Sequence, residues 1–418
     1  MKKALKLLGL STLLSASVAA AQDVTITYWQ YEFASKVTLM NKLIARFEAQ
    51  NPGIKVKQET FPYDAYNQKV ATSIPAGQGP DVVNLFYGWL PQYVDGGYLQ
   101  ALPAKDFPVR TIDANFVPMV KTSKIDGKYY ALPTAVRTLA IFYNKELFKQ
   151  AGIRSAPRTW NDFLTAAQKI TKGAAPRFTT LGFAMAPDGQ DYHVLREVLL
   201  RQYGGRPYSA DGKQATYDTE AGVKALTFYA DLVTKYKVGV PNFFPGNNAY
   251  RDAFIAGRAG MIIDGSFAIG SIRSGAKFDW GVATLPVMNQ GGQRGNFGSY
   301  WVNGITKNAR GAKLDASVKF LKFLTSEEVM REWLRDVGEI PASRRLSSQA
   351  DLRKDPVYGP FVQSLPFATS TLFVDEAGQR RVWVDAINSV ILEKGDPAAA
   401  LKRAVAEEQK ILNDYYKK

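Results

Sequence analysis

The alternation of strand-like and helix-like segments constrains the fold more than any other feature of the sequence. Residues 23–28 alternate apolar and polar side chains as a strand does, and apolar side chains then recur at helical spacing over 37–47. Residues 54–57 alternate again, 66–74 carry a second helical pattern, and 81–86 form a third, apolar strand. Strands and helices in series predict a largely parallel sheet with right-handed crossovers.

A second series of segments follows residues 128–144, an extended stretch that is broken at Pro133 and is too long to serve one sheet. We expect this stretch to cross between two lobes. Thr159 and Asp162 predict a capping box, and Gly338 predicts a helix end. The other expected segments are helices at 159–172, 192–203, 220–236, 314–337 and 380–418, a strand at 278–286 that returns to the first lobe, and strands at 178–185, 261–263 and 298–306.

Two lobes also suit the chain length, because 418 residues exceed what one hydrophobic core usually serves. The expected fold is α/β, with each lobe a mostly parallel sheet flanked by helices and a multi-strand hinge between them. The expected first lobe comprises residues 22–132 and about 287–340. The expected second lobe comprises about 133–286 and 341–418.

The first 21 residues are typical of a secretory signal peptide. Three early lysines precede the apolar residues 7–18, and small residues follow. The apolar part is shorter than the roughly 20 residues of a membrane-spanning helix. We expect cleavage after Ala21 or Ala20, and a protein located in the periplasm.

Cysteine is absent, which excludes disulfides, thiolate nucleophiles and cysteine metal sites, and also the cysteine that a bacterial lipid anchor needs. The formal net charge of +15 permits attraction to nucleic acid or to an anionic surface. Lys and Arg are scattered, however, and form no basic run. We therefore expect no nucleic-acid partner.

Nine motifs occur along the chain in this order: TITYW, NPGIKV, GQGPDVV, WLPQYVDGGYLQAL, YYALPTAVRTLAIFYNKELFKQAGI, TWNDFLTAAQKIT, GRAGMIIDGS, KFLKFLTSEEVMREW and VGEIPAS. Together they resemble the extracellular solute-binding proteins of the maltose-binding type, which serve ABC sugar importers. The resemblance implies the two-lobed periplasmic-binding-protein fold, closure on ligand, and docking on a membrane permease.

A carbohydrate site needs polar groups for the sugar hydroxyls and aromatic rings for the C–H faces. In open α/β sheets such residues gather after the carboxyl ends of strands. The candidate ligand-binding residues, chosen by this rule and by the resemblance, are Trp29, Gln30, Tyr31, Glu32, Asp64, Tyr87, Trp89, Arg137, Asp188, Asp264, Ser266, Phe267, Ser299, Tyr300, Trp301 and Glu339.

Several of these residues have a structural alternative. Asp64 can cap a helix, and Asp264 can cap the helix that begins near residue 266. Arg137 needs a partner that is either a ligand or a protein carboxylate. Strand alternation lets only one of Tyr300 and Trp301 face the ligand.

The sequence therefore predicts a monomeric binding protein that delivers a mono- or oligosaccharide to an ABC importer, without catalytic residues, metal or cofactor. An anionic sugar derivative, such as a phosphate or sulfonate, is the first alternative ligand. A secreted glycoside-acting enzyme is a further alternative, since carboxylates in a cleft can hydrolyse glycosides. The single histidine, His193, excludes a His-rich metal site.

Overall fold

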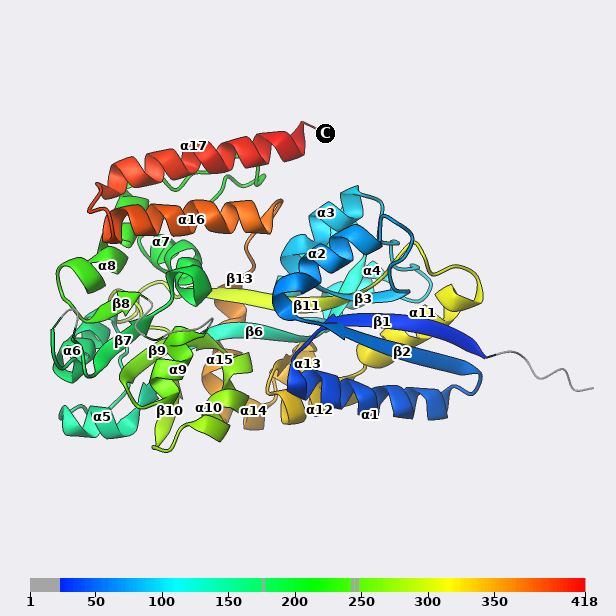
Figure 1. Cartoon of the computed structure of the whole chain (residues 1–418), viewed down its shortest axis with the longest axis horizontal. Coiled ribbons are helices and arrows are strands. Elements are labelled where there is room, and N and C mark those ends of the chain that lie inside the picture. Colours follow the sequence, from blue (N-terminus) through cyan, green and yellow to red (C-terminus); the bar gives the residue numbers. More distant parts are fainter. Residues whose placement is uncertain (1–22, 175–176, 242–243, 245–247, 418) are drawn as a thin grey trace, which may run out of the picture.

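The computed structural model describes residues 23–417 except 175–176, 242–243 and 245–247. The expected signal peptide lies outside the described residues. Two α/β lobes are joined by long strands that run from one to the other (Figure 1). No helix in the described part of the chain is both long enough and apolar enough to cross a bilayer.

The first lobe is built as the strand–helix alternation predicts. Strand β1 pairs in parallel with β2 and with β3, and α1 packs its buried face, including Leu39, Leu43 and Phe47, against the sheet. Its elements are β1 (Val24–Tyr31), α1 (Ala34–Gln50), β2 (Ile54–Phe61), α2 (Tyr63–Ser73), β3 (Val82–Phe86), α3 (Leu90–Asp95), α4 (Val109–Asn115), β4 (Lys124–Ile125), β5 (Lys128–Tyr129), α11 (Ala312–Leu324) and α12 (Glu327–Val337).

Two strands belong to both lobes. β6 (Ala131–Asn144) and β11 (Asn296–Ile305) pair antiparallel, and the sheet order is β2-β1-β3-β11-β6-β9-β7-β8. The start of β6 pairs with β11, whereas its end pairs with β9 and β10 of the second lobe. The expected crossing within 128–144 is confirmed by this arrangement.

The second lobe repeats the plan around β7 and β9, which are parallel. β10 pairs with the end of β6, so residues 280–283 complete the second lobe instead of returning to the first. Its elements are α5 (Lys145–Gln150), α6 (Trp160–Ile170), β7 (Leu181–Met185), α7 (Leu200–Gln202), α8 (Glu220–Thr234), β8 (Gly239–Pro241), α9 (Ala249–Ile255), β9 (Ala259–Gly265), α10 (Ile269–Gly275) and β10 (Trp280–Ala283).

The chain from residue 340 onward crosses between the lobes again. α13 contacts α4, so these residues still pack on the first lobe, and the exact lobe boundaries stay a prediction. The elements of this segment are β12 (Ile340–Pro341), α13 (Arg344–Ser347), α14 (Ala350–Lys354), α15 (Gly359–Ser364), β13 (Ala368–Thr369), α16 (Glu376–Ile391) and α17 (Pro397–Tyr416).

Two of the local capping signals in the sequence were correct. Thr159 and Asp162 form the predicted capping box, and Gly338 ends α12 with a φ of 85°, a conformation that favours glycine. The prediction for Asp64 as a cap is wrong, because α2 begins after Pro62 and places residue 64 inside its first turn. In the helix predicted at 192–203, residues 194–199 form π-helical turns, and α7 follows them.

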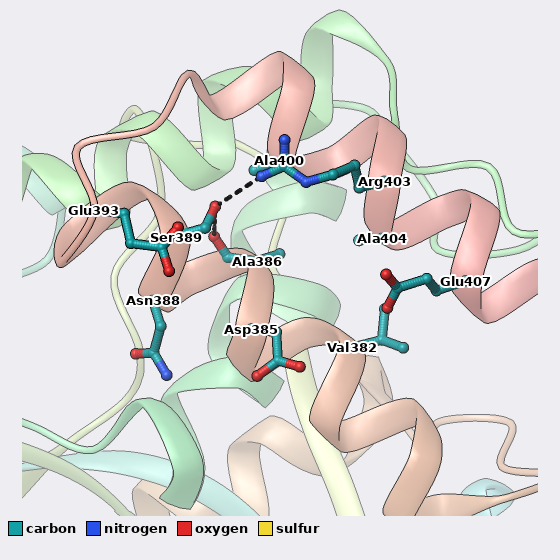
Figure 2. Close-up of a pocket in the computed structure, with 10 residues that line it drawn as sticks. All are labelled: Val382, Asp385, Ala386, Asn388, Ser389, Glu393, Ala400, Arg403, Ala404 and Glu407. Carbon is teal, nitrogen blue, oxygen red and sulfur yellow. Dashed lines mark hydrogen bonds between the residues drawn. The ribbon is translucent and has the colours of Figure 1, made fainter.

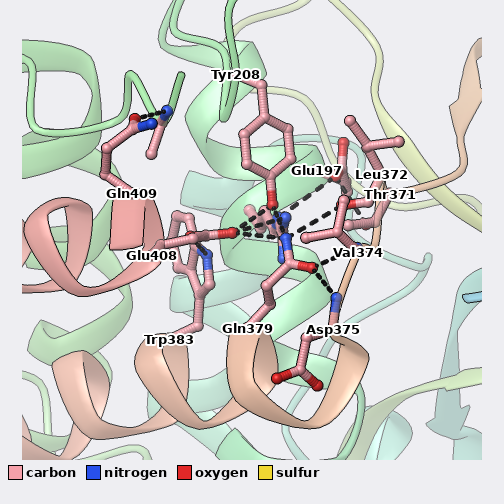
Figure 3. Close-up of polar contacts among 12 residues, drawn as sticks. Glu197, Tyr208, Thr371, Leu372, Val374, Asp375, Gln379, Trp383, Glu408 and Gln409 are labelled. Atoms are coloured by element: carbon pink, nitrogen blue, oxygen red, sulfur yellow. Dashed lines mark hydrogen bonds and ion pairs between the residues drawn. The ribbon is translucent and has the colours of Figure 1, made fainter. Parts of the chain in front are cut away.

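A buried polar network fixes the last crossing to the second lobe (Figure 3). The Glu408 carboxylate of α17 accepts hydrogen bonds from Gln379, Trp383, Tyr208 and Arg196. The Gln379 side chain in turn accepts from the backbone N–H groups of residues 374 and 375. Since all of these side chains are buried, the network holds the start of α16 in one position.

Candidate ligand-binding site

Arg137 on β6 makes contacts with both lobes. Its Nε donates to Glu339 Oε1 at 2.6 Å, and its Nη2 donates to the Tyr31 hydroxyl at 3.1 Å. The guanidinium carbon lies 4.8 Å from the centre of the Phe267 ring in the second lobe. Trp301 joins this group because its ring lies 4.2 Å from that of Tyr31. We name these five residues, Tyr31, Arg137, Phe267, Trp301 and Glu339, the interlobe cluster.

Glu339 is the charged centre of the interlobe cluster. Besides Arg137, Lys36 Nζ lies 3.0 Å from its Oε1, and Trp333 Nε1 donates to its Oε2 at 2.8 Å. Burial alone would raise the pKa of Glu339, but the charges of Arg137 and Lys36 and the bond from Trp333 outweigh it and lower the pKa to about 2. Glu339 is therefore an anion held by protein donors.

Aromatic rings form one side of the site. The rings of Trp89 and Tyr63 lie 5.4 Å and 6.2 Å from that of Trp301, and Tyr63 also lies 5.5 Å from Tyr31. Tyr63 is 54% exposed, so its face is available to a ligand. Sequence reasoning missed it, although it follows the end of β2 and the rule of inspecting strand ends would have found it.

Charges of the second lobe act on Tyr63. Figure 1 shows the start of α16 directed towards α2. Partial burial of the Tyr63 hydroxyl raises its pKa. The charge of Arg380 on α16 lowers this pKa, and the charge of Glu376 on the same helix raises it. Arg380 Nη2 lies 2.8 Å from Glu376 Oε1. The sequence did not single out this pair, because Glu and Arg four residues apart are common on any solvated helix.

The second lobe adds an ion pair beside Phe267. Asp264 is the second-to-last residue of β9, its side chain is fully buried, and its Oδ2 accepts from Arg251 Nε at 2.8 Å. Its Oδ1 accepts from the backbone N–H of residue 265 at 2.8 Å, so Asp264 is part of the strand and not the cap of the next helix. Arg251 on α9 was missed, since nothing in its local sequence marks it.

Three predicted site residues carry buried polar atoms without a protein partner in the described part of the chain. These are the Tyr87 hydroxyl, Trp89 Nε1 and the Ser266 hydroxyl. Tyr87 and Trp89 follow β3 in the first lobe, and Ser266 follows β9 in the second. Buried polar atoms are seldom left unpaired in folded proteins, which favours a role in binding for all three.

Tyr300 and Trp301 occupy different surroundings. The Tyr300 hydroxyl accepts from Ser123 at 3.0 Å and donates to a backbone carbonyl, and its ring stacks on Tyr87 at 4.7 Å. Tyr300 is thus fully used by the protein, whereas Trp301 lies at an irregularity in the pairing of β11 with β6. Of the two, Trp301 is the better ligand candidate.

Some predicted residues lie apart from the interlobe cluster. Trp29 packs its ring 4.8 Å from that of Phe61, and Gln30 donates to Gln58 of β2 at 2.6 Å, so both serve the packing of the first lobe. Glu32 is exposed just after β1, and its carboxylate accepts no hydrogen bond from the described residues. These contacts favour the structural alternative for the first two.

The remaining three predicted residues differ in their positions. Asp64 has a described backbone in α2, but its side chain lies outside the described part of the structure. Asp188 is exposed in the turn after β7. Ser299 is buried on β11 directly opposite Arg137, beside the interlobe cluster.

A cavity of about 400 Å³ lies elsewhere, between α16 and α17 (Figure 2). Arg403 in its wall donates to the Ser389 hydroxyl at 3.3 Å. None of its lining residues belongs to the interlobe cluster, and no aromatic ring lines it. The rings and unpaired donors between the lobes therefore mark the better candidate site.

Comparison with known proteins gives consistent results. The family model of bacterial extracellular solute-binding proteins matches residues 32–331. A maltotriose-binding protein of Pyrococcus abyssi is 26% identical over 82% of this chain and 72% of that protein. A galactooligosaccharide-binding protein of Bacillus subtilis is 26% identical over 93% of this chain and 90% of that protein. The GacH receptor of Streptomyces glaucescens, solved unliganded and with acarbose, has a TM-score of 0.81, is 25% identical, and covers 94% of this chain and 99% of its own.

Proposed function

Because the chain belongs to the bacterial extracellular solute-binding protein family, we propose that it binds a carbohydrate outside the cytoplasmic membrane and delivers it to an ABC importer. The observation that carries the proposal is the interlobe cluster, where aromatic rings from both lobes adjoin the polar groups of Arg137, Glu339 and Tyr31. Rings suit the C–H faces of a sugar, and unpaired donors such as Tyr87, Trp89 and Ser266 suit its hydroxyls.

The charges at the site favour a neutral ligand over an anionic one. Arg137 is paired with Glu339, and Arg251 is paired with Asp264. Lys36 is 2% exposed and cannot reach a ligand without a rearrangement of the site. A phosphate or sulfonate would therefore meet guanidinium groups whose charges protein carboxylates already compensate, and no uncompensated cation of this group would balance its charge.

The same contacts support a binding role without catalysis. A glycosidase needs one carboxyl group as an acid with a raised pKa and a second as a base or nucleophile. Both oxygens of Glu339 and both oxygens of Asp264 are engaged by protein donors, so neither carboxylate is free to attack a sugar or to activate water. The relatives whose names state a function are also binding proteins.

The family resemblance adds the rest of the proposal. The protein acts in the periplasm as a monomer after loss of its signal peptide, closes its two lobes on the ligand, and docks in that form on the importer's permease subunits. The long shared strands β6 and β11 are suited to a hinge because each has one end in each lobe.

A ligand screen tests the proposal. The purified protein would be titrated by calorimetry with mono-, di- and trisaccharides and with sugar phosphates. We expect at least one neutral saccharide to bind and to raise the melting temperature with its concentration. Binding of sugar phosphates alone, abolished by Arg137→Ala, would establish the anionic alternative. Turnover of a glycoside would establish an enzyme.

A further inference from the structure

The Phe267 ring has a guanidinium group near it from two different elements. Arg137 of β6 lies 4.8 Å from the ring centre, and Arg251 of α9 lies 5.3 Å from it. Cation–π contacts of this length hold a guanidinium plane in place. Because the ring is engaged by two cations, it is not free to serve as the main stacking surface for a sugar.

Arg251 is held by three groups in all. Besides Phe267, its Nε donates to Asp264 Oδ2 at 2.8 Å and its Nη2 donates to the Tyr250 hydroxyl at 3.3 Å. Asp264 is itself fixed, since it is fully buried and accepts a backbone N–H. Arg251 is 12% exposed, so it is mostly buried and immobilised but still reaches the surface of the site.

Arg251 also keeps unused donors. Its Nη1 makes no hydrogen bond to any residue that the structure describes. This nitrogen is accessible to solvent, whereas the unpaired Nε and Nη1 of Arg196 are buried. The carboxylate of Asp264 cancels its charge. Such a group is a rigid, charge-compensated donor, which suits an oxygen acceptor of a neutral molecule better than a mobile lysine does.

We propose that Arg251 is a specificity-determining residue, whose Nη1 group donates to a hydroxyl or ring oxygen of the bound saccharide. Asp264 and Phe267 are then positioning residues that act through Arg251 and do not themselves contact the ligand. This inference rests on the proposed carbohydrate function, and it changes the role that the sequence analysis expected for these two residues.

The neighbouring Arg137 occupies a different position. Its Nε and Nη2 donate to Glu339 and Tyr31, in the first lobe. Since Phe267 contacts both guanidinium groups, it fixes Arg251 relative to a residue that is tied to the first lobe. Through the Phe267 ring, Arg251 is thus linked to the interlobe cluster.

The test compares Arg251→Lys with the wild type, using a saccharide that the wild type binds and a set of its monodeoxy analogues. Lys keeps the charge opposite Asp264 but lacks the guanidinium fork. We expect the affinity of the variant for the parent saccharide to fall about 10- to 100-fold. We also expect that at least one deoxy analogue, which the wild type binds more weakly than the parent saccharide, binds the variant with the same affinity as the parent saccharide.

The ratio of parent to analogue affinity separates contact from structure. Both ligands are measured on the same folded variant, so a loss of stability affects them equally. Phe267→Leu keeps Arg251 and Asp264. It should lower the ratio of parent to analogue affinity by less than Arg251→Lys does. Arg403→Lys, in the cavity between α16 and α17, is the matched control and should leave every ratio unchanged.

Two results would overturn the inference. Arg251→Lys with wild-type affinity and an unchanged analogue profile would show that Arg251 only compensates the buried charge of Asp264. An equal loss for the parent and for all analogues would show the same. Failure of the wild type to bind any saccharide would instead reject the proposed function, and the inference with it.

Discussion

Glu339 Oε1 accepts a hydrogen bond from Arg137 Nε at 2.6 Å, across 202 positions of the chain. The same oxygen lies 3.0 Å from Lys36 Nζ, so one buried carboxylate is paired with two cations, of which Lys36 is buried and Arg137 is mostly buried. One of these cations belongs to α1 and the other to the shared strand β6. Glu339 thereby ties the first lobe to the hinge.

Replacing Glu339 with Gln should therefore destabilise the protein by about 3–5 kcal/mol, because it leaves buried cations without a counter-charge. Urea denaturation at pH 7 measures this change. Asp279→Asn breaks the exposed pair with Lys145 and should cost about 0.5 kcal/mol or less. An equal loss of unfolding free energy in the two variants would show that the buried ion pair stabilises the protein no more than the exposed one.

The effect of Glu339→Gln should also depend on pH. The folded pKa of Glu339 is about 2, below the ordinary value of 4.5, so its contribution is fully present above pH 4.5. It is lost as the pH falls from 4.5 through 2. The stability difference between wild type and variant should shrink over that range, and a constant difference would argue against the ion pair as its source.

Local features of this fold were readable from the sequence, and long-range pairs were not. The capping box of Thr159 and Asp162 and the terminal Gly338 depend on residues a few positions away. The pairing of Arg137 with Glu339 depends on how two distant segments meet, which no local pattern encodes. Sequence reasoning could state that Arg137 needs a partner, but not which partner.

The candidate site shows the same division. Inspection of strand ends found Tyr31 and Trp89, because the topology itself brings those ends together. Trp301 lies within β11 and was found through the family resemblance. Inspection of strand ends missed Arg251, which lies on a helix and reaches the site only through Asp264 and Phe267.

Asp191 should make the stability of the protein depend on pH near neutrality. Burial raises its pKa to about 7, and the charges of Asp188 and Asp264 add to this, although bonds from the backbone of residue 186 and from the Tyr229 hydroxyl oppose it. A raised folded pKa means that its contribution is present below about pH 3.8 and is lost as the pH rises through 7.

Asp191→Asn removes this ionisation while keeping one acceptor oxygen. Relative to the wild type, the variant should gain in unfolding free energy between pH 5 and pH 8, as measured by denaturant titration at several pH values. Asp351→Asn, on the exposed α14, serves as the control and should run parallel to the wild type. Parallel curves for Asp191→Asn as well would contradict the raised pKa.

Tyr63→Ala should weaken saccharide binding with little loss of stability. The ring is 54% exposed and lies beside Tyr31 and Trp301, so its removal takes away a stacking surface but little core packing. A loss of about 1–3 kcal/mol corresponds to a roughly 5- to 150-fold rise in Kd. Calorimetry measures it, and Tyr416→Ala, another exposed tyrosine, should leave Kd unchanged. Wild-type affinity of the Tyr63 variant would place the ligand elsewhere.

Ligand binding should change the tryptophan fluorescence, chiefly through Trp89 and Trp301. Their rings lie 5.4 Å apart beside the interlobe cluster, and each is only 7% exposed, so closure of the lobes alters the packing and hydration of both. Trp160 lies in the second lobe, where its Nε1 donates to Gln202, away from the cluster.

Titration with a ligand confirmed by calorimetry should shift the emission of the wild type and of Trp160→Phe alike. Trp301→Phe should lose most of the shift while still binding. A shift that survives in Trp301→Phe and in Trp89→Phe but disappears in Trp160→Phe would show that the ligand acts on the second lobe and not on the cluster between the lobes.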